Sequence, residues 1–341
     1  MTVSRMSNGL RLGTIHLWGD SLANFREEVR LADELGFSLI GLGDSPAGWH
    51  ELYGSLAVAA HVIKRATLAP MVTAPFLRHP LITANAMSTL GDMVDGRVAL
   101  GFATGGGTAL ATGYGQATLA RMRSEIGALR DLFAGRETTW EERPNKSLRF
   151  PRPVPIHLSA VGPKAMALAG ELADGVILFS NMDLDALDVK IAAVRAAAKA
   201  AGRDPLSIDI WVVSYCSIRD SADEAVDDLK AFLVAAGMAL RAPGAIDTVP
   251  PKYRKQVEEM FRRYDVTEHV VVGGRNVKMM EELGLTNYLR DFDSVYGTEA
   301  EVRKVLDGMA ERGVSTFIAP LPGHADPLGT IRRLGALLEK N

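Results

Sequence analysis

Short apolar segments alternate with longer amphipathic segments along nearly the whole chain, and this alternation limits the possible folds more than any other feature. The apolar segments have the length of strands and are apolar throughout, as expected for strands that are covered on both faces. Eight such strands are predicted, at Leu10–Trp18, Ser38–Gly43, Ala66–Thr73, Val98–Ala103, Val154–Ala160, Gly175–Ser180, Ser207–Tyr215 and Val314–Pro320. Each is followed by a predicted helix, so the pattern favours a parallel sheet in an α/β protein.

Eight strand–helix units close naturally into a (β/α)8 TIM barrel, which is the fold class that we predict. A doubly wound open sheet is the alternative. The first strand runs into Trp18-Gly19-Asp20-Ser21, which lacks the glycine fingerprint that a dinucleotide-binding sheet carries at this point. We therefore favour the barrel.

Two stretches interrupt the repeat and predict insertions within a single domain that spans residues 1–341. The segment 134–152 holds two short β-prone runs around Pro144-Asn145 and predicts a small hairpin. The segment 240–298 is charged and interrupted by prolines, and it predicts a helical excursion before the last strand.

The composition excludes several classes of function. The single cysteine, Cys216, cannot form a disulfide framework within the chain or a cysteine-rich metal site. A net charge of −3 and an aromatic content of 6% give no reason to expect nucleic acid as a partner. The sequence has no signal-peptide pattern and no apolar run of membrane-spanning length, so we expect a cytoplasmic protein without membrane contact.

The sequence shows no cluster with the spacing of a metal site or of a covalent nucleophile. His50-Glu51 lacks the second histidine that a zinc-binding helix needs, and no Gly-x-Ser-x-Gly elbow is present. His16 and His157 lie on predicted strands and face either the lumen or the helices. We therefore predict no metal and infer that a bound redox cofactor carries the chemistry.

In a barrel the active site is built from the loops at the carboxyl ends of the strands. The loop Ser159-Ala160-Val161-Gly162-Pro163-Lys164 follows the fifth strand and opens a helix. Pro163 suits a first helical turn, and the exposed N–H groups there, together with Lys164, predict an anion site. The loop Thr104-Gly105-Gly106-Gly107 follows the fourth strand, and its glycines let the backbone approach a flat or anionic ligand. Ordinary turns remain the alternative for both loops.

Asp44 ends the second strand, where a carboxylate on an apolar strand needs a partner. We name it as the candidate catalytic residue and as a contact of a substrate or of a cofactor ring. Trp18, Ser45 and Trp49 lie in the loops after the first two strands and are candidate substrate contacts. The alternatives are a helix-capping role for Asp44 and a packing role for Trp49.

Several stretches together make the chain similar to a known family. In order they are Leu35-Gly36-Phe37 with Gly43-Asp44-Ser45, Val72-Thr73-Ala74-Pro75 with Arg78-His79-Pro80, Gly96-Arg97-Val98-Ala99-Leu100-Gly101 with Thr104-Gly105, the run from Pro155 to Val176, and Val314-Ser315-Thr316-Phe317. The chain resembles the bacterial luciferase-like superfamily of flavin- and deazaflavin-dependent oxidoreductases. Its loop Ala160-Val161-Gly162-Pro163-Lys164 is most similar to that of the methylene-tetrahydromethanopterin-reductase-like group.

The resemblance implies a barrel that holds a flavin or deazaflavin at its mouth. It implies that the loop from Ser159 to Lys164 binds the cofactor phosphate. It also implies that a bulge at Met71-Val72-Thr73, often with a non-prolyl cis peptide in relatives, supports the ring. Asp44, Thr104 and Gly105 fall where relatives touch the ring, and Gly106 is the next candidate contact. A homodimer is a further implication.

The chain differs from deazaflavin-dependent sugar and alcohol dehydrogenases at two positions. Ser45 stands in place of a histidine and Gly106 in place of an acid, so two candidate proton-transfer groups are missing. We predict coenzyme F420 as the cofactor, with hydride transfer to or from a small organic substrate. One alternative is an FMN-dependent two-component monooxygenase, which needs a flavin reductase as partner. The other is a flavin-binding protein without turnover.

Overall fold

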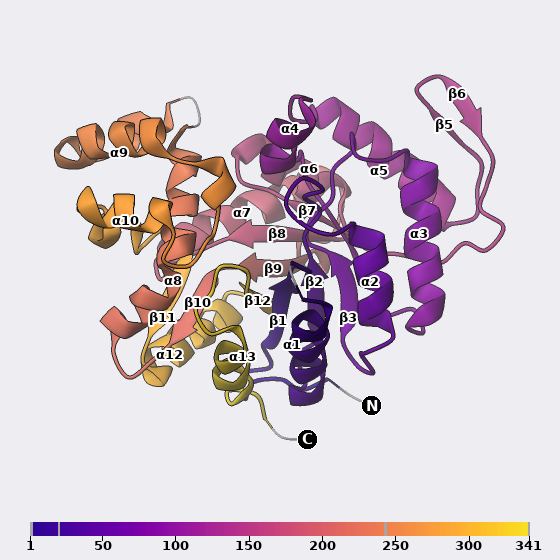
Figure 1. Ribbon diagram of the computed structural model, residues 1–341. Helices are drawn as coiled ribbons and strands as arrows, with labels where there is room; N and C mark the ends of the chain where they lie inside the picture. The colour runs from indigo at the N-terminus through magenta and orange to yellow at the C-terminus, as the bar shows by residue number, and fades with distance from the viewer. Residues whose placement is uncertain (1–2, 20, 242–243, 340–341) are drawn as a thin grey trace.

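The computed structural model describes residues 3–19, 21–241 and 244–339. Eight parallel strands form the central sheet in the order β3-β2-β1-β12-β9-β8-β7-β4. The two outermost strands, β3 and β4, meet through the parallel bridges Leu68–Val98 and Thr73–Phe102, which close the sheet into a barrel surrounded by helices (Figure 1). The predicted (β/α)8 barrel is confirmed, and the open doubly wound sheet is wrong.

All eight predicted strands are present. They are β1 Arg11–His16, β2 Leu39–Leu42, β3 Thr67–Pro70, β4 Leu100–Phe102, β7 Ile156–Ser159, β8 Gly175–Phe179, β9 Asp209–Val213 and β12 Thr316–Pro320. The helices that follow them are α1 Leu22–Leu35, α2 Leu52–Ala60, α3 Pro80–Met93, α4 Gly106–Thr112, α5 Leu119–Phe133, α6 Pro163–Leu172, α7 Leu184–Ala200, α12 Glu299–Glu311 and α13 Pro327–Gly335. These helices return the chain to the same end of the barrel each time, so the carboxyl ends of the strands share one edge.

Helix α1 shows why many of these bounds are readable from the sequence. The Ser21 side chain caps the helix by accepting a hydrogen bond from the Asn24 amide. Gly36 ends it in the left-handed conformation, with φ of 95°, which a residue without a Cβ adopts at little cost. The cap at Ser21 and the glycine at position 36 are both local signals, so the sequence alone indicates where the helix begins and ends.

Side chains alternate between the lumen of the barrel and the surrounding helices. Leu39, Ile177 and Ile318 pack against each other in the lumen, whereas Ile40 and Leu42 pack under the helices. A strand with apolar residues at both parities is buried on both faces, as its sequence predicts.

The two strand histidines face opposite ways: His16 ends β1 at the carboxyl edge, whereas His157 lies near the amino-terminal end of β7. His16 turns outward, with its Nδ1 atom 3.1 Å from Glu28 of α1. His157 turns inward, where its Nε2 atom lies 3.1 Å from Asp209 and its ring stacks on Trp211 at 3.6 Å. Asp209 is the first residue of β9, so this second pair fills the amino-terminal end of the barrel.

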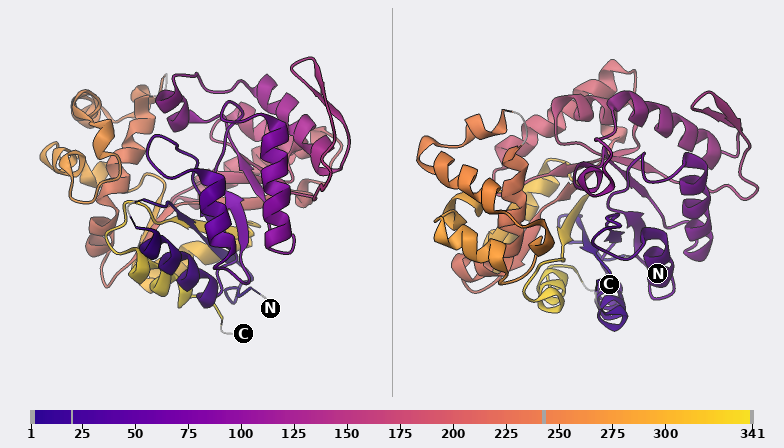
Figure 2. Two further views of the ribbon diagram at one scale, coloured as in Figure 1. Left: turned by 45° about the vertical axis from the view of Figure 1, so that its right-hand side comes forward. Right: turned by 45° about the horizontal axis from the view of Figure 1, so that its top comes forward.

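Two segments extend from the barrel. Strands β5 Thr138–Trp140 and β6 Arg143–Asn145 pair as an antiparallel hairpin within the segment 134–152. The other segment runs from β10 to β11 and comprises β10 Tyr215–Ile218, α8 Ala222–Gly237, α9 Pro251–Arg263, α10 Arg275–Glu282, α11 Thr286–Leu289 and β11 Ser294–Gly297. The hairpin and the α9–α10 region lie on opposite sides of the barrel in all views (Figures 1 and 2).

The segment from β10 to β11, which we call the inserted unit, has a hydrophobic core of its own. Leu229, Phe232, Met260 and Met280 are among its buried residues. Strands β10 and β11 pair with each other in parallel and form a separate small sheet. The unit thus starts before the segment 240–298, within which residues 242 and 243 lie outside the described part of the chain.

Within the ranges that the structure describes, no helix has the length and apolar character needed to cross a bilayer. Over the same ranges, no group of three or more His, Cys, Asp or Glu side chains is arranged to hold a metal ion.

Gly101 is needed where β4 closes the barrel against β3. A Cβ at this position would lie 2.2 Å from the Pro70 carbonyl oxygen. We expect Gly101→Ala to lower the free energy of unfolding by about 2–3 kcal/mol, because backbone must move to relieve the overlap. Gly127→Ala is the control, since Gly127 lies exposed in α5 with nothing near its Cβ position and gains up to about 1 kcal/mol from helix propensity. Equal urea midpoints for the two variants would contradict this view of the seam.

Glu125 of α5 is fully buried, and neither of its carboxyl oxygens has a hydrogen-bond partner among the described residues. Burial raises the pKa of Glu125 to about 8, against an opposing effect from the charge of Arg121. The side chain is therefore protonated at neutral pH, while the unfolded chain ionises near its ordinary value of 4.5.

The folded state consequently holds a proton that the unfolded state has lost between these two pH values. The contribution of Glu125 to stability is intact below the lower value and is lost as pH rises through the higher one, by about 1.4 kcal/mol per pH unit. We expect Glu125→Gln to remove this slope in urea unfolding measured between about pH 5 and pH 8. The exposed Glu142→Gln variant should keep the wild-type slope, and a wild type without any such slope would contradict the assignment.

Candidate functional site

Four neighbouring strands carry all the predicted cofactor contacts. β2 pairs with β3, β3 meets β4 at the seam, and β4 pairs with β7. The loops that hold Asp44, residues 71–73, residues 104–106 and residues 159–164 are therefore consecutive along one arc of the carboxyl edge. The structure brings these sequence-distant segments together as the barrel fold predicts.

The segment after β3 forms the middle of this arc. A non-prolyl cis peptide joins Met71 and Val72, at the position that the resemblance implied. The Met71 side chain packs on Gly41, where a Cβ would lie 2.5 Å from it. Val72 and the neighbouring lumen residues Ile15 and Phe179 are apolar and only partly buried. The layer of lumen side chains nearest the carboxyl ends of the strands is thus an apolar surface that is accessible to solvent.

Asp44 is buried, and both of its carboxylate oxygens are bonded to protein groups. Thr73 donates its hydroxyl to Oδ2 at 2.6 Å, and Arg78 donates to Oδ2 at 2.5 Å and to Oδ1 at 3.2 Å. The Asp44 carbonyl accepts the Thr108 hydroxyl at 2.9 Å. One residue therefore ties together the loops that follow β2, β3 and β4.

Arg78 joins this network to helix α2. It also donates to Glu51 at 2.8 Å, and its guanidinium lies 4.9 Å from the centre of the Tyr53 ring. Burial lowers the pKa of Arg78, but the hydrogen bond and the charge of Asp44 outweigh it and raise the pKa overall. For the carboxyl group of Glu51, burial raises the pKa. Hydrogen bonds from the Gly54 and Tyr53 amides and from Arg78 outweigh this effect, so the pKa is lowered overall. Arg78 and Glu51 therefore keep their charges.

The glycine loop after β4 turns sharply next to this network. Gly105 has φ of 81°, and a Cβ there would lie 2.5 Å from the Phe76 ring, so the position accommodates only glycine. The Thr104 carbonyl accepts the Ala117 amide at 2.9 Å, and Gly106, the first residue of α4, is exposed.

The start of α6 has the features of an anion site. Gly162 is the N-cap and supplies no side-chain cap, and Pro163 occupies the first turn. Nothing lies within 4 Å of a Cβ built on Gly162, and Val161, Pro163 and Lys164 are exposed, whereas Ala160 is buried against β8. N–H groups that face open space at the positive end of a helix dipole attract a phosphate.

The aromatic candidates lie at the β1 and β2 end of the arc. The Trp18 ring stacks on Phe25 at 5.9 Å and on His50 at 4.4 Å. The ring of Trp49 packs against Gly19, and Ser45 is half-buried at the start of the same loop. Trp18 is thus covered by two rings, while His50 is exposed.

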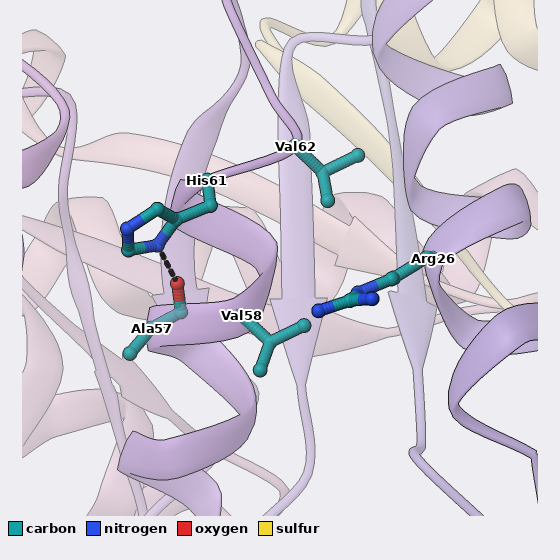
Figure 3. Close-up of a pocket in the computed structure, with 5 residues that line it drawn as sticks. All are labelled: Arg26, Ala57, Val58, His61 and Val62. Carbon is teal, nitrogen blue, oxygen red and sulfur yellow. Dashed lines mark hydrogen bonds between the residues drawn. The ribbon is translucent and has the colours of Figure 1, made fainter.

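A groove on the outside of the barrel is unrelated to this edge. It is lined by Arg26 of α1 and by four residues at the C-terminal end of α2, Ala57, Val58, His61 and Val62 (Figure 3). Because α2 starts at the carboxyl edge, its C-terminal end lies toward the opposite end of the barrel. We assign no function to this groove.

Sequence reasoning missed Arg78, Glu51 and His50 as site residues. The signal for Arg78 was available, because a buried carboxylate such as Asp44 requires a positive partner and Arg78 stands in the next loop. Glu51 and His50 had no comparable signal, since only the fold brings them against Arg78 and Trp18.

Comparison with protein families agrees with this architecture. The family model described as "Luciferase-like monooxygenase" matches residues 2–316. The 5,10-methylenetetrahydromethanopterin reductase of Methanolobus tindarius is 27% identical over 328 residues, which are 93% of this chain and 95% of that protein. The F420-dependent glucose-6-phosphate dehydrogenase of Nakamurella multipartita is 30% identical over 226 residues, which are 60% of this chain and 66% of that protein.

The fold has close counterparts among solved structures. The coenzyme F420-dependent tetrahydromethanopterin reductase of Methanopyrus kandleri superposes with a TM-score of 0.79, over 96% of this chain and 97% of that one, at 21% sequence identity. At this identity the likeness establishes the barrel with its insertions and nothing finer.

The buried ion pair between Arg78 and Asp44 gives a test of the network. We expect Arg78→Ala to lower the free energy of unfolding by about 3–5 kcal/mol, because it leaves a buried carboxylate without its counter-ion. Arg30→Ala is the matched control, since Arg30 pairs with Glu27 and Glu34 on the surface, where such pairs contribute at most about 1 kcal/mol. Equal losses in urea unfolding would show that Asp44 is not stabilised by Arg78.

Proposed function

Because the chain belongs to the luciferase-like monooxygenase family, we propose that it is an oxidoreductase that uses the deazaflavin F420 for hydride transfer to or from a small organic substrate. Family membership confirms the resemblance found in the sequence. The relatives that match it are named as reductases and dehydrogenases, which supports the choice of an oxidoreductase. Two of them carry F420 in their names, which supports the choice of cofactor.

The N-terminus of α6, which has no side-chain cap, is the structural observation that supports the proposal. A nucleotide-like cofactor presents a phosphate. The start of α6 leaves room for one, since no described residue accepts a hydrogen bond from the Gly162 or Lys164 amide. Ser159, Ala160, Val161, Gly162, Pro163 and Lys164 form the loop that would hold it, with Lys164 adding a positive charge. The donor set therefore fits the phosphate of a flavin or a deazaflavin.

The cofactor ring would lie against the layer of lumen side chains nearest the carboxyl ends of the strands. Met71, Val72 and Thr73 form its support in this proposal, and Thr104, Gly105 and Gly106 approach it from the neighbouring loop. When bound, F420 supplies or accepts the hydride. The chain's own contribution is to position the substrate and to exclude water from the apolar surface around Val72 and Phe179.

Asp44 is part of the proposed site as a positioning residue. Its carboxylate is fully engaged by Thr73 and Arg78, so we propose that it positions the loops that hold the ring. Trp18, Ser45 and Trp49 remain the proposed substrate contacts, since their loops follow β1 and β2 at the same edge.

The alternative is an FMN-dependent two-component monooxygenase of the same family, with a flavin reductase as partner. The family's own description as monooxygenase favours it. A homodimer, a cytoplasmic location and a single domain with two insertions remain further proposals, and light scattering of the purified protein tests the first of them.

Direct titration with each cofactor tests the function. We expect the purified protein to bind F420 and to bind FMN at least tenfold more weakly, which corresponds to about 1.4 kcal/mol. Tight FMN binding with oxygen consumption would establish the monooxygenase instead. Binding of neither cofactor would overturn the proposal.

The same titration tests the phosphate loop. Gly162→Asp places a carboxylate at the positive end of α6, and we expect it to weaken F420 binding by about tenfold or more. Lys164→Ala should weaken it by about threefold. Lys199→Ala, in the last turn of α7, is the control and should bind as the wild type does. Unchanged affinity in both loop variants would place the phosphate elsewhere.

A further inference from the structure

Hydride transfer between a cofactor and a carbonyl or alcohol needs a group that exchanges a proton with the substrate oxygen. Resting on the proposed function, we propose that His50 is this catalytic residue and that its Nε2 atom carries the proton.

His50 lies at the edge where the cofactor is proposed to bind. It belongs to the loop between β2 and α2, directly after Trp49, and its side chain is exposed. Its ring is nearly parallel to that of Trp18, at 4.4 Å and 9°. This stacking holds an exposed imidazole in one orientation, which a proton-transfer group requires.

A hydrogen bond fixes which nitrogen is available. The Nδ1 atom of His50 lies 2.9 Å from the Trp18 carbonyl oxygen. A carbonyl only accepts, so Nδ1 must carry the hydrogen, and the neutral ring has its lone pair on Nε2. No described residue forms a hydrogen bond with Nε2, so that atom is open to a substrate.

Among the described residues of the loops after β2 and β3, the other acids and bases are already engaged. Both oxygens of Asp44 are bonded to Thr73 and Arg78. Glu51, the charged residue next to His50, accepts from Arg78 with one carboxylate oxygen and from the Gly54 amide with the other. His79 accepts the Leu81 amide at Nδ1, which fixes the opposite tautomer. Phe25 and Trp18, the other two rings of the Phe25–Trp18–His50 stack, carry no ionisable group.

The proton balance is simple in both directions. In alcohol oxidation Nε2 of His50 would take the proton of the breaking O–H bond as the C=O bond forms, and the oxidised deazaflavin would supply the hydride acceptor. In carbonyl reduction the imidazolium of His50 would return this proton to the oxygen, and the reduced deazaflavin would supply the hydride. No other reactant is needed.

His50→Asn is the informative variant, because its amide can still donate to the Trp18 carbonyl while nothing replaces Nε2. His61→Asn is the matched control. His61 is also exposed, and its Nδ1 lies 2.8 Å from the Ala57 carbonyl oxygen, but it stands at the other end of α2 (Figure 3). Urea unfolding should show both variants folded, since neither side chain is buried.

The first measurement needs no cofactor. Nitrogen NMR of the purified protein should show the neutral His50 ring protonated at Nδ1, and a ring protonated at Nε2 would overturn the proposal. The second measurement is reduction of a panel of aldehydes and ketones by F420H2. We expect His50→Asn to lower kcat by about 100-fold and to abolish one limb of its pH profile, with F420 affinity unchanged. His61→Asn should match the wild type.

The outcomes separate the two proposals. A wild-type protein that does not bind F420 overturns the proposed function itself. Normal F420 binding with wild-type kcat and pH profile in His50→Asn overturns only the role of His50. A wild type that binds F420 but reduces no member of the panel also overturns it, because no substrate oxygen then needs the proton.

Discussion

The seam between β3 and β4 determines where the candidate site lies. Only a glycine at position 101 lets the Pro70 carbonyl approach closely enough for the two ends of the eight-stranded sheet to meet. Thr73 lies in this seam: its amide donates to the Gly101 carbonyl, its own carbonyl accepts from the Ala103 amide, and its hydroxyl reaches Asp44. The backbone contact that closes the barrel thus also fixes the segment proposed to support the cofactor ring.

The buried Asp44–Arg78 pair extends this arrangement outward. A buried ion pair contributes little net stability, but removing one partner is costly, so such a pair enforces one geometry. Here the enforced geometry joins three loops and the start of α2. The pair is therefore better suited to holding these loops in place than to exchanging protons, and the proposed proton-transfer group, His50, is accordingly an exposed side chain.

Much of the fold follows from local signals, and the site follows only in part. The bounds of α1 come from Ser21 and Gly36, and the eight strands come from uniform burial, so both were predictable. The predicted strand Ser207–Tyr215 is instead divided at Ser214, because that residue's hydroxyl bonds to the Asp293 carbonyl, nearly eighty positions later in the chain, and Tyr215 pairs with a different sheet. The direction of Asp44 was predictable in principle, since it continues the outward series Ile40 and Leu42. The stacking of His50 on Trp18 was not, because it depends on how two loops meet.

The separate core of the inserted unit has a consequence for how such a protein changes over time. The unit leaves the barrel after β9 and returns before α12, so two chain crossings connect it to the rest. Substitutions among Leu229, Phe232, Met260 and Met280 are buffered within that core and leave the packing under the barrel helices untouched. Natural selection can therefore remodel this region, or exchange it for a segment of another length, without altering the proposed cofactor site on the opposite arc of strands.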